Sequence, residues 1–380
     1  MPARVRTSAV SHVDIARMTA EPIAAPSAPS RFASVDILRG LTVAAMLLVN
    51  NAGDWSQVYP WLEHAAWHGC HAADYIFPLF LFIAGVSLTL ALEPQLECGW
   101  PAGLLNRAIL LRALRIVALG LVLHMAAALL IPERNFRLAG VLQRIGVCIA
   151  VAGPVALHLR PRAQWMLFAA LLLGYALLLA VGGIAEENSL NLRIDTALLG
   201  RYAYQFDPAT GRAFDPEGVL STLGAIASTL LGLRAGSWLR RGAVGALLRW
   251  GVAFALLGFA ASFVQPFNKA LWTPSYVLWT GGVAMLLLAG THGLVDRRGL
   301  WLPGRALGLN AILAYAGSWL MICVLAALGA DRWLYDHAFA SWLTPLAGAR
   351  TASMAWACAI VAVWWLIALA LHRRRWYWKI

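Results

Sequence analysis

Ten apolar runs, each close to the length of a membrane-spanning helix, restrict the possible folds of this chain more than any other feature. A helix needs about 20 predominantly apolar residues to cross the hydrocarbon core of a bilayer. Such runs occupy residues 35–51, 74–92, 108–131, 140–157, 164–184, 218–239, 250–265, 274–294, 306–328 and 352–372. They predict an all-α, polytopic integral membrane protein with about ten transmembrane helices.

The amino-acid composition supports this class of protein. Of the 380 residues, 61% are hydrophobic and 13% are charged, whereas a soluble domain is about half apolar and about a quarter charged. The net charge of +12 would suggest nucleic-acid binding in a soluble protein. Here the arginines are scattered at the ends of apolar runs, so no nucleic-acid partner is expected. The five cysteines form no Cys-x-x-Cys pair, which argues against a disulfide framework or a zinc site.

The distribution of arginine predicts the orientation of the helices, because cytoplasmic loops of membrane proteins carry an excess of Lys and Arg. Both termini are expected on the cytoplasmic side, with residues 1–33 as a disordered tail and residues 34–380 as one transmembrane domain. The loop containing His64 and the loops 185–217 and 329–350 should face the opposite side. The arginines that decide this precede the first run, open the third, and lie at 160–162, 234–249, 297–305 and 373–375.

A polar, histidine-rich stretch between the first two runs is the strongest candidate for a reactive site. Histidine can take or give a proton near neutral pH, and His64 has two carboxylates nearby, Glu63 and Asp74, that could fix its tautomer. Asn50 and Asn51, at the end of the first run, could donate hydrogen bonds to a developing oxyanion. These five residues would then form the centre of an active site at the membrane edge.

The same stretch also has simpler interpretations. His64 could cap a helix or be solvated in a loop, and Asp74 could be an ordinary helix cap. His68 and His71 follow His64 by four and seven residues, a spacing that lacks the ligand pattern of known zinc motifs. No metal site is therefore expected.

Five polar residues at the starts of later runs are further candidates. Gln143 and Arg144 open the fourth run, where a charged residue usually faces the protein interior with a partner. Arg144 could instead reach the interface as a plain anchor. Asp215 and Glu217 form either a regular helix start or a pair of carboxylates that attracts a cationic acceptor. Asn310 could bond between helices.

Taken together, these motifs resemble the heparan-α-glucosaminide N-acetyltransferase family, and within it the bacterial NagX-type inner-membrane proteins. The resemblance covers nearly the whole chain after residue 33. It rests on five segments that occur in the family's order: Ser34–Gly40, Asn50–Gly85, Gly140–Arg144, Asp215–Thr222 and Leu309–Ala311.

The resemblance implies a multi-pass acetyltransferase of the bacterial inner membrane. It would move acetyl from cytosolic acetyl-CoA to the amine of a glucosamine-type sugar on the periplasmic side. His64 takes the place of the family's active-site histidine, and Asn50 matches its asparagine, although the loop before His64 is longer here and leaves Asn51 as a competitor. Asp74 is the third expected catalytic residue. An amino-sugar acceptor and membrane lipid are the expected partners, and a homodimer stays open.

The other expected site residues fall into two groups. Arginines at the cytoplasmic ends of helices could hold the phosphates of acetyl-CoA, since Arg pairs bidentately with phosphate, or could be ordinary positive-inside charges. These are Arg39, Arg107, Arg112, Arg115, Arg240 and Arg241. The acceptor is expected to contact Asn51, Asp54, Trp67, Gln143, Arg144, Asp215, Glu217 and Asn310.

Two chemical routes and two other functions remain open at this stage. His64 could act as the general base toward the acceptor amine, or it could be acetylated itself to give an acetyl-imidazole. A chain of this kind could also be an inner-membrane amino-sugar permease, or an O-acetyltransferase of a cell-envelope glycan.

Overall fold

The computed structural model describes residues 32–378, and within them almost all regular structure is helical. The expected tail, residues 1–33, lies almost entirely outside this range. The longer helices are α1 (Ala33–Asn50), α2 (Ile76–Glu97), α3 (Ala102–Leu130), α4 (Val141–His158), α5 (Pro161–Gly182), α7 (Thr222–Arg240), α8 (Val244–Ala261), α9 (Pro274–His292), α11 (Ala311–Ala327) and α14 (Ala349–Arg373). The shorter ones are α6 (Leu190–Leu198), α10 (Arg305–Leu309), α12 (Ala330–Tyr335) and α13 (Ser341–Ala347).

A polytopic membrane fold is confirmed by these helices. Within the described residues, eight helices are long and apolar enough to span a bilayer, and a ninth span arises if α11 is counted together with the α12–α13 segment. That pair is bent by 96°, and the π-helical turn Asp336–Ala340 joins α12 to α13. The long loop between α5 and α7 also holds one small antiparallel hairpin, β1 (Gln205–Phe206) with β2 (Ala213–Phe214).

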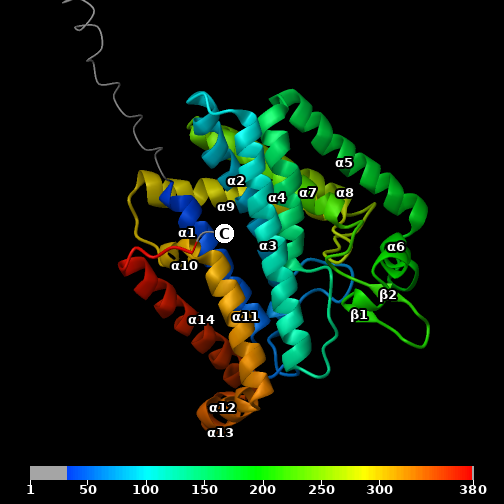
Figure 1. Ribbon diagram of the computed structural model, residues 1–380, viewed down its shortest axis with the longest axis vertical. Coiled ribbons are helices and arrows are strands. Elements are labelled where there is room, and N and C mark those ends of the chain that lie inside the picture. Colours follow the sequence, from blue (N-terminus) through cyan, green and yellow to red (C-terminus); the bar gives the residue numbers. More distant parts are fainter. Residues whose placement is uncertain (1–31, 379–380) are drawn as a thin grey trace, which may run out of the picture. The chain divides into compact units, whose positions relative to one another are not determined.

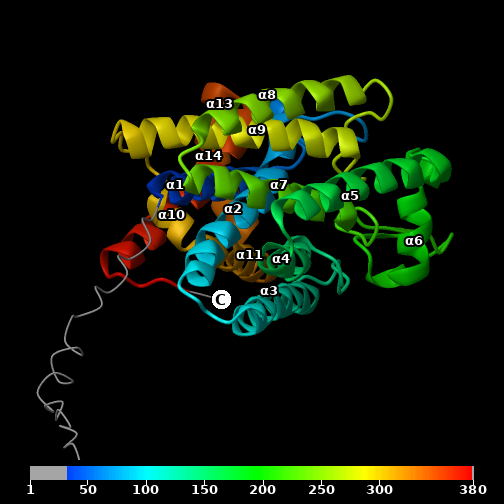
Figure 2. The same cartoon turned by 90° about the horizontal axis from the view of Figure 1, so that it is seen from above.

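The sixth expected span, residues 218–239, corresponds to α7, which forms a helix at the expected place but is not apolar enough to count as a span. It is an interior helix, packed against α2, α4, α5 and α9 (Figure 2). Two of its hydroxyl groups bond to its own backbone: Ser228 donates to the carbonyl of Gly224, and Thr229 donates to that of Ala225. A helix surrounded by other helices does not need a lipid-compatible surface, and this explains its lower hydropathy.

Small residues let α7 approach α2 very closely. A Cβ atom added to Gly232 would lie 2.0 Å from the carbonyl oxygen of Phe82, and one added to Gly85 would lie 2.1 Å from that of Thr229. Helices in membranes commonly pack through such small residues, because they gain van der Waals contact rather than a hydrophobic driving force.

Two of the loops that the arginine distribution predicts on one face, the His64 loop and the loop between α5 and α7, contact each other. Trp67 donates from Nε1 to the carbonyl of Ile184 at 3.0 Å and packs on Phe214 at a ring distance of 5.5 Å. The amide of Leu138, between α3 and α4, donates to the carbonyl of Tyr202 at 3.0 Å. In Figure 1 the α12–α13 segment and the hairpin both lie in the lower half of the picture.

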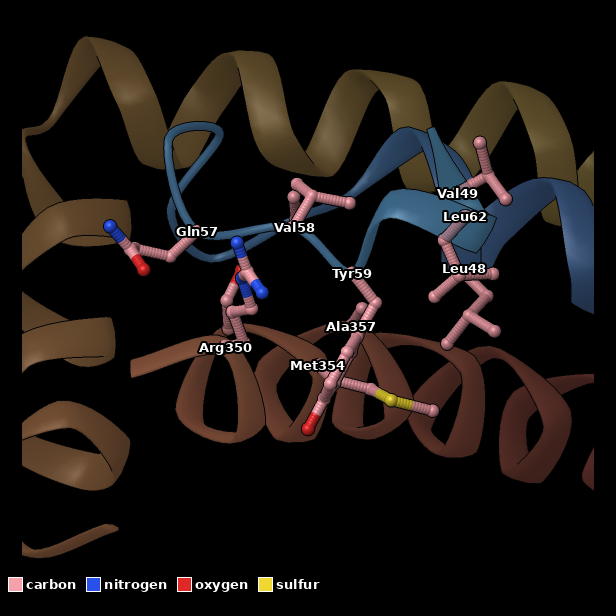
Figure 3. A pocket seen from close by; sticks show the side chains of 11 residues that line it. Leu48, Val49, Gln57, Val58, Tyr59, Leu62, Arg350, Met354 and Ala357 are labelled. Carbon is pink, nitrogen blue, oxygen red and sulfur yellow. The ribbon is translucent and has the colours of Figure 1, made fainter. Parts of the chain in front are cut away.

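The chain between α1 and His64 is fixed on α14. The Tyr59 hydroxyl lies 3.0 Å from the Thr351 hydroxyl, and the amide of Asp54 donates to Ser353 Oγ at 3.0 Å. A small cavity of about 20 Å³ lies between these two segments. Figure 3 shows Val58 and Tyr59 from the loop above Met354 of α14. The fold thus anchors the loop well before it reaches His64.

Candidate active site

His64 and Asp74 form the centre of the site. His64 Nδ1 lies 2.7 Å from Asp74 Oδ1. The other carboxylate oxygen accepts backbone N–H groups from Ala65 at 3.1 Å and from His71 at 2.8 Å. The Asp74 side chain is 1% exposed, whereas that of His64 is 44% exposed. Asp74 therefore both caps the short 3₁₀ turn Ala72–Tyr75 and holds the imidazole, so the two interpretations of this residue coexist.

This pairing defines the tautomer of a neutral His64. An ionised carboxylate can only accept, so the ring proton belongs on Nδ1 and the lone pair on Nε2. Asp74 is itself held in place, because the Tyr276 hydroxyl donates to its peptide carbonyl at 2.5 Å. The outcome is a half-exposed imidazole with a basic nitrogen available to a bound molecule.

Lys269 is the third group at this centre, and it comes from the segment between α8 and α9. Its Nζ lies 3.1 Å from His64 Nδ1, 2.9 Å from His64 Nε2 and 3.8 Å from Asp74 Oδ1. Burial lowers the pKa of Lys269, while Asp74 and Glu217 act in the opposite direction. Burial also raises the pKa of the neighbouring Cys70 thiol to about 12, so this thiol is no nucleophile at neutral pH.

The segment that carries Lys269 is firmly held. The amide of Gly69 donates to the carbonyl of Phe267 at 2.7 Å, which joins it to the His64 loop. Asn268, fully buried, accepts from the amide of Leu271 at 2.7 Å. Trp272 follows with a φ of 55°, a left-handed conformation that is costly for a bulky residue and persists only where the surroundings enforce it.

A second polar cluster centres on Arg137. This side chain donates from Nε to Asp215 Oδ2 at 2.8 Å and from Nη2 to both Asp215 and Glu217. The two carboxylates raise the pKa of Arg137 against the effect of its burial. Arg137 and Arg144 together lower the pKa of Glu217, although burial alone would raise it. The carboxylates expected to attract a cationic acceptor are thus already paired with a guanidinium.

Arg144 and Gln143 lie beside this cluster and are almost completely buried. Arg144 donates from Nη2 to Ser221 Oγ at 2.5 Å and stacks over the Trp272 ring at 5.1 Å, while its Nε and Nη1 find no hydrogen-bond partner among residues 32–378. Gln143 Nε2 contacts His124 Nδ1 at 3.2 Å, and its Oε1 has no partner in the same range. This agrees with the expectation that Arg144 faces the protein interior rather than the membrane surface.

The expected catalytic residue Asn50 and the remaining acceptor candidates lie in different places. Asn50 lines a cavity of about 60 Å³ with Ser318 and Trp319, and no hydrogen bond joins it to His64 within the described residues. Asn51 donates to the carbonyl of Leu47 at 2.6 Å. Asp54 accepts from Ser56 and adjoins α14, and Trp67 fixes its own loop as described above. Asn310 is bonded to the backbone of Trp376 and Trp378 near the chain end.

The arginines proposed for acetyl-CoA also differ from one another. Arg240 forms ion pairs with Glu93 and Glu97, and Arg39 bonds to Asp36 at 2.6 Å and to the carbonyl of Gly308. The more exposed ones are Arg107, Arg112, Arg115 and Arg241.

Sequence reasoning missed Lys269 and Arg137. A signal for the first was available: the chain uses Lys at only two positions, 269 and 379, against 28 arginines. A lone lysine three residues after a Gln-Pro pair, in a segment predicted to share a face with His64, is unusual in such a chain. Arg137 gave no comparable signal, since its partners lie 78 and 80 residues away.

Comparison with known proteins finds the same family that the sequence motifs resemble. A family profile described as "Heparan-alpha-glucosaminide N-acetyltransferase, catalytic" matches residues 31–198. The chain is 29% identical over 416 residues to heparan-alpha-glucosaminide N-acetyltransferase of Homo sapiens, covering 93% of this chain and 60% of the relative. The chain is thus similar to members of the heparan-α-glucosaminide N-acetyltransferase family. The Mus musculus protein of the same name is 27% identical, with 93% and 61% covered.

The chain spans about 60% of the length of these curated relatives. The segment matched by the heparan-α-glucosaminide N-acetyltransferase profile contains His64, Asp74, Arg137 and Arg144, whereas Lys269 and Glu217 lie beyond it. The centre of the site is therefore built partly from outside the profile's range.

Proposed function

We propose that this protein transfers acetyl from acetyl-CoA to the amine of a glucosamine-type sugar. The observation that carries the proposal is the His64–Asp74 pair, which leaves a basic Nε2 half exposed at the end of the helix bundle. The names of the two relatives point to the same class of reaction.

In the proposed reaction the acceptor must first become a free amine, because an ammonium has no lone pair. His64 Nε2 accepts a proton from the attacking amine. A C–N bond forms at the thioester carbonyl, the C–S bond breaks, and the proton passes to the leaving thiolate. Asp74 steadies the imidazolium that forms in between. The other route, in which Nε2 itself attacks the thioester, uses the same pair and gives an acetyl-imidazole.

We assign Asn50 to the steadying of the oxyanion, as the family resemblance suggests. Asn50 lines a neighbouring cavity. Either the substrate carbonyl would have to lie close to Asn50, or the loop of residues 51–71 would have to move His64 toward it. The acceptor would enter beside Trp67, with Asn51, Asp54, Gln143, Arg144, Asp215 and Glu217 as the wider set that shapes the pocket. Asn310 is left out of this set, because it lies near the chain end, beside the start of α1 rather than its His64 end. Since Asp215 and Glu217 are already paired with Arg137, these two carboxylates would hold sugar hydroxyl groups rather than an ammonium.

We further propose a bacterial inner-membrane location of the NagX type, with both termini in the cytoplasm and His64 on the periplasmic face. Acetyl-CoA is cytoplasmic, so its pantetheine arm would pass between helices to reach His64. Arg107, Arg112, Arg115 and Arg241 are better placed to hold its phosphates than Arg240 or Arg39, because both of the latter bond to carboxylates.

The decisive experiment is acetyl transfer by the purified protein in lipid nanodiscs. Labelled acetyl-CoA is offered with a panel of amino sugars, and wild type is compared with His64→Ala. We expect N-acetylated sugar from the wild type and a loss of at least about 100-fold in the variant. Equal rates in both would refute the role of His64. A permease would transport the sugar without being thermally stabilised by acetyl-CoA, whereas linkage predicts stabilisation of an enzyme that binds it.

A further inference from the structure

Lys269 occupies a position that the proposed reaction has not yet used. Its Nζ is almost equidistant from the two ring nitrogens of His64, at 2.9 and 3.1 Å. The lone-pair directions of these nitrogens diverge in the ring plane, so Nζ can form an aligned hydrogen bond with at most one of them. Nδ1 is already bonded to Asp74. A position in the ring plane at nearly equal distance from both nitrogens would collide with the ring carbon between them, so Nζ lies over the face of the ring and the in-plane lone pair of Nε2 stays free for a substrate.

An ammonium at this place has donors to spare. It carries three N–H groups, and within residues 32–378 its polar side-chain contacts are those with His64 and, at 3.8 Å, with Asp74. The Lys269 side chain is 22% exposed, so at least one N–H can point toward a bound molecule. The segment around it is fixed by Asn268 and by the contact of Gly69 with Phe267, so the amine is held in place before a substrate arrives.

The positive charge of a Lys269 ammonium suits one task in acyl transfer, the stabilisation of an oxyanion. When the acceptor amine adds to the thioester carbonyl, the π electron pair moves onto oxygen, and this oxyanion lasts until the pair returns and the C–S bond breaks. The amine that gives its proton to Nε2 must lie about 3 Å from Nε2, and the carbonyl carbon adjoins that amine. Nζ is also 2.9 Å from Nε2, so the carbonyl oxygen can lie directly against it.

We propose that the Lys269 ammonium stabilises this oxyanion and is thus a catalytic residue of the transfer. The inference rests on the proposed acetyltransferase function and deepens it. Lys269 gains and loses no proton in the step; the amine proton goes to His64 Nε2 and then to the thiolate. Burial lowers the pKa of Lys269, while the negative charges of Asp74 and Glu217 act in the opposite direction and favour the ammonium. Lys269 would act together with Asn50 or in its place.

The test compares Lys269→Met with Lys269→Arg, which keeps the charge, and with Arg212→Met as a control that removes an exposed cation from the hairpin loop. We expect kcat of Lys269→Met to fall about 100-fold to 1,000-fold, the usual effect of losing one oxyanion donor. The KM for acetyl-CoA should change less than about threefold. Lys269→Arg should keep a measurable part of the lost rate, and Arg212→Met should match wild type.

A second measurement separates this role from a structural one. Binding is measured for two CoA analogues, one with a ketone in place of the thioester and one with a tetrahedral phosphonate in place of the acetyl group. Lys269→Met should weaken the phosphonate analogue by at least about tenfold more than the ketone. Equal weakening of both analogues, or a kcat within about threefold of wild type, would overturn the role of Lys269 while His64-dependent transfer still stood. Absence of transfer in the wild type would overturn both proposals.

Discussion

At the scale of single residues, the imidazole of His64 is held by groups that differ in charge and in origin. Asp74 is ten residues away and fixes the tautomer, while Lys269 is 205 residues away and lies against both ring nitrogens. The carboxylate is buried and the imidazole is half exposed. A buried orienting group with an accessible base is the arrangement that general-base chemistry requires.

Replacing Asp74 by Asn tests the tautomer argument. The amide can present its N–H₂ to Nδ1 and so place the ring proton on Nε2, where it blocks proton acceptance. We expect Asp74→Asn to lower kcat by about 100-fold to 10,000-fold with a smaller change in the KM for acetyl-CoA. Glu186→Gln, an exposed carboxylate between α5 and α6, is the matched control. A rate for Asp74→Asn close to that of the control would contradict the assignment.

Asp195 of α6 makes a prediction about pH. It is fully buried and accepts from the amides of Asp215 and Val219, both at 3.2 Å. Burial raises its pKa to about 6. In the unfolded chain the group releases its proton at lower pH, so the free energy of unfolding should fall as pH rises from about 4 to about 6 and level off above that.

The measurement is the melting temperature of wild type minus that of Asp195→Asn, followed from pH 4 to pH 7.5. This difference should decrease across pH 4–6 and then stay constant, because the variant lacks the titrating group. Glu186→Gln, tested in the same way, should give no such slope. A difference that rises with pH would mean that Asp195 is stabilised as a carboxylate.

At the scale of elements, α7 shows how a helix that looks like a membrane span becomes an interior one. It has hydroxyl groups and glycines where a lipid-facing helix has large apolar side chains, and fifteen of its residues are buried. The close contact of Gly232 with Phe82 replaces the packing of larger side chains. It packs against α2 and α9, and α2 follows directly on the 3₁₀ turn that contains Asp74.

This packing predicts opposite effects for two glycine substitutions. Gly232→Ala would place a Cβ 2.0 Å from a carbonyl oxygen, so the helices must separate, and we expect a melting temperature in detergent lower by several degrees. Gly174→Ala, in α5, meets no atom within 4 Å. It should be neutral or stabilising by about 0.5–1 kcal/mol, since alanine favours the helix. Equal melting temperatures for the two variants would contradict the close α2–α7 contact.

At the scale of the whole molecule, the loops that carry the candidate site converge at one end of the helices. Five segments contribute: the His64 loop, the loop between α3 and α4, the loop between α5 and α7, the segment between α8 and α9, and the start of α14. They contact one another through Trp67, Leu138, Phe267 and Ser353. A site assembled from several loops can be shaped for a large acceptor without changing the helices beneath it.

The orientation of this end can be measured in intact cells. Single cysteines are introduced at Asp207 in the hairpin loop and at Arg374 after α14, with the exposed Cys98 and Cys358 replaced by alanine. A membrane-impermeant maleimide that crosses the outer membrane should label the cysteine at 207 but not the one at 374 until the inner membrane is opened. The reverse pattern would invert the proposed topology and place His64 in the cytoplasm.

Much of the fold could be predicted from the sequence, because hydropathy over about 20 residues is a local property. The run at 35–51 became α1, and the one at 352–372 became α14, within a few residues. The pairing of His64 with Asp74 was also foreseeable, since only ten residues separate them. Two exceptions occur. The environment of α7 is decided by its surroundings and cannot be inferred from its own residues, and residues 329–350, expected as a loop, form the helices α12 and α13.

By itself, the sequence determined that the chain is a helical membrane protein and indicated that His64 and Asp74 belong together. Only the tertiary structure decided which cations meet the carboxylates and the imidazole. Arg137 reaches Asp215 across 78 residues, and Lys269 reaches His64 across 205. Such pairings depend on how helices pack and where their ends meet. No local sequence pattern encodes that geometry. An apolar run, by contrast, indicates by its own composition that it must lie in lipid or in a protein interior.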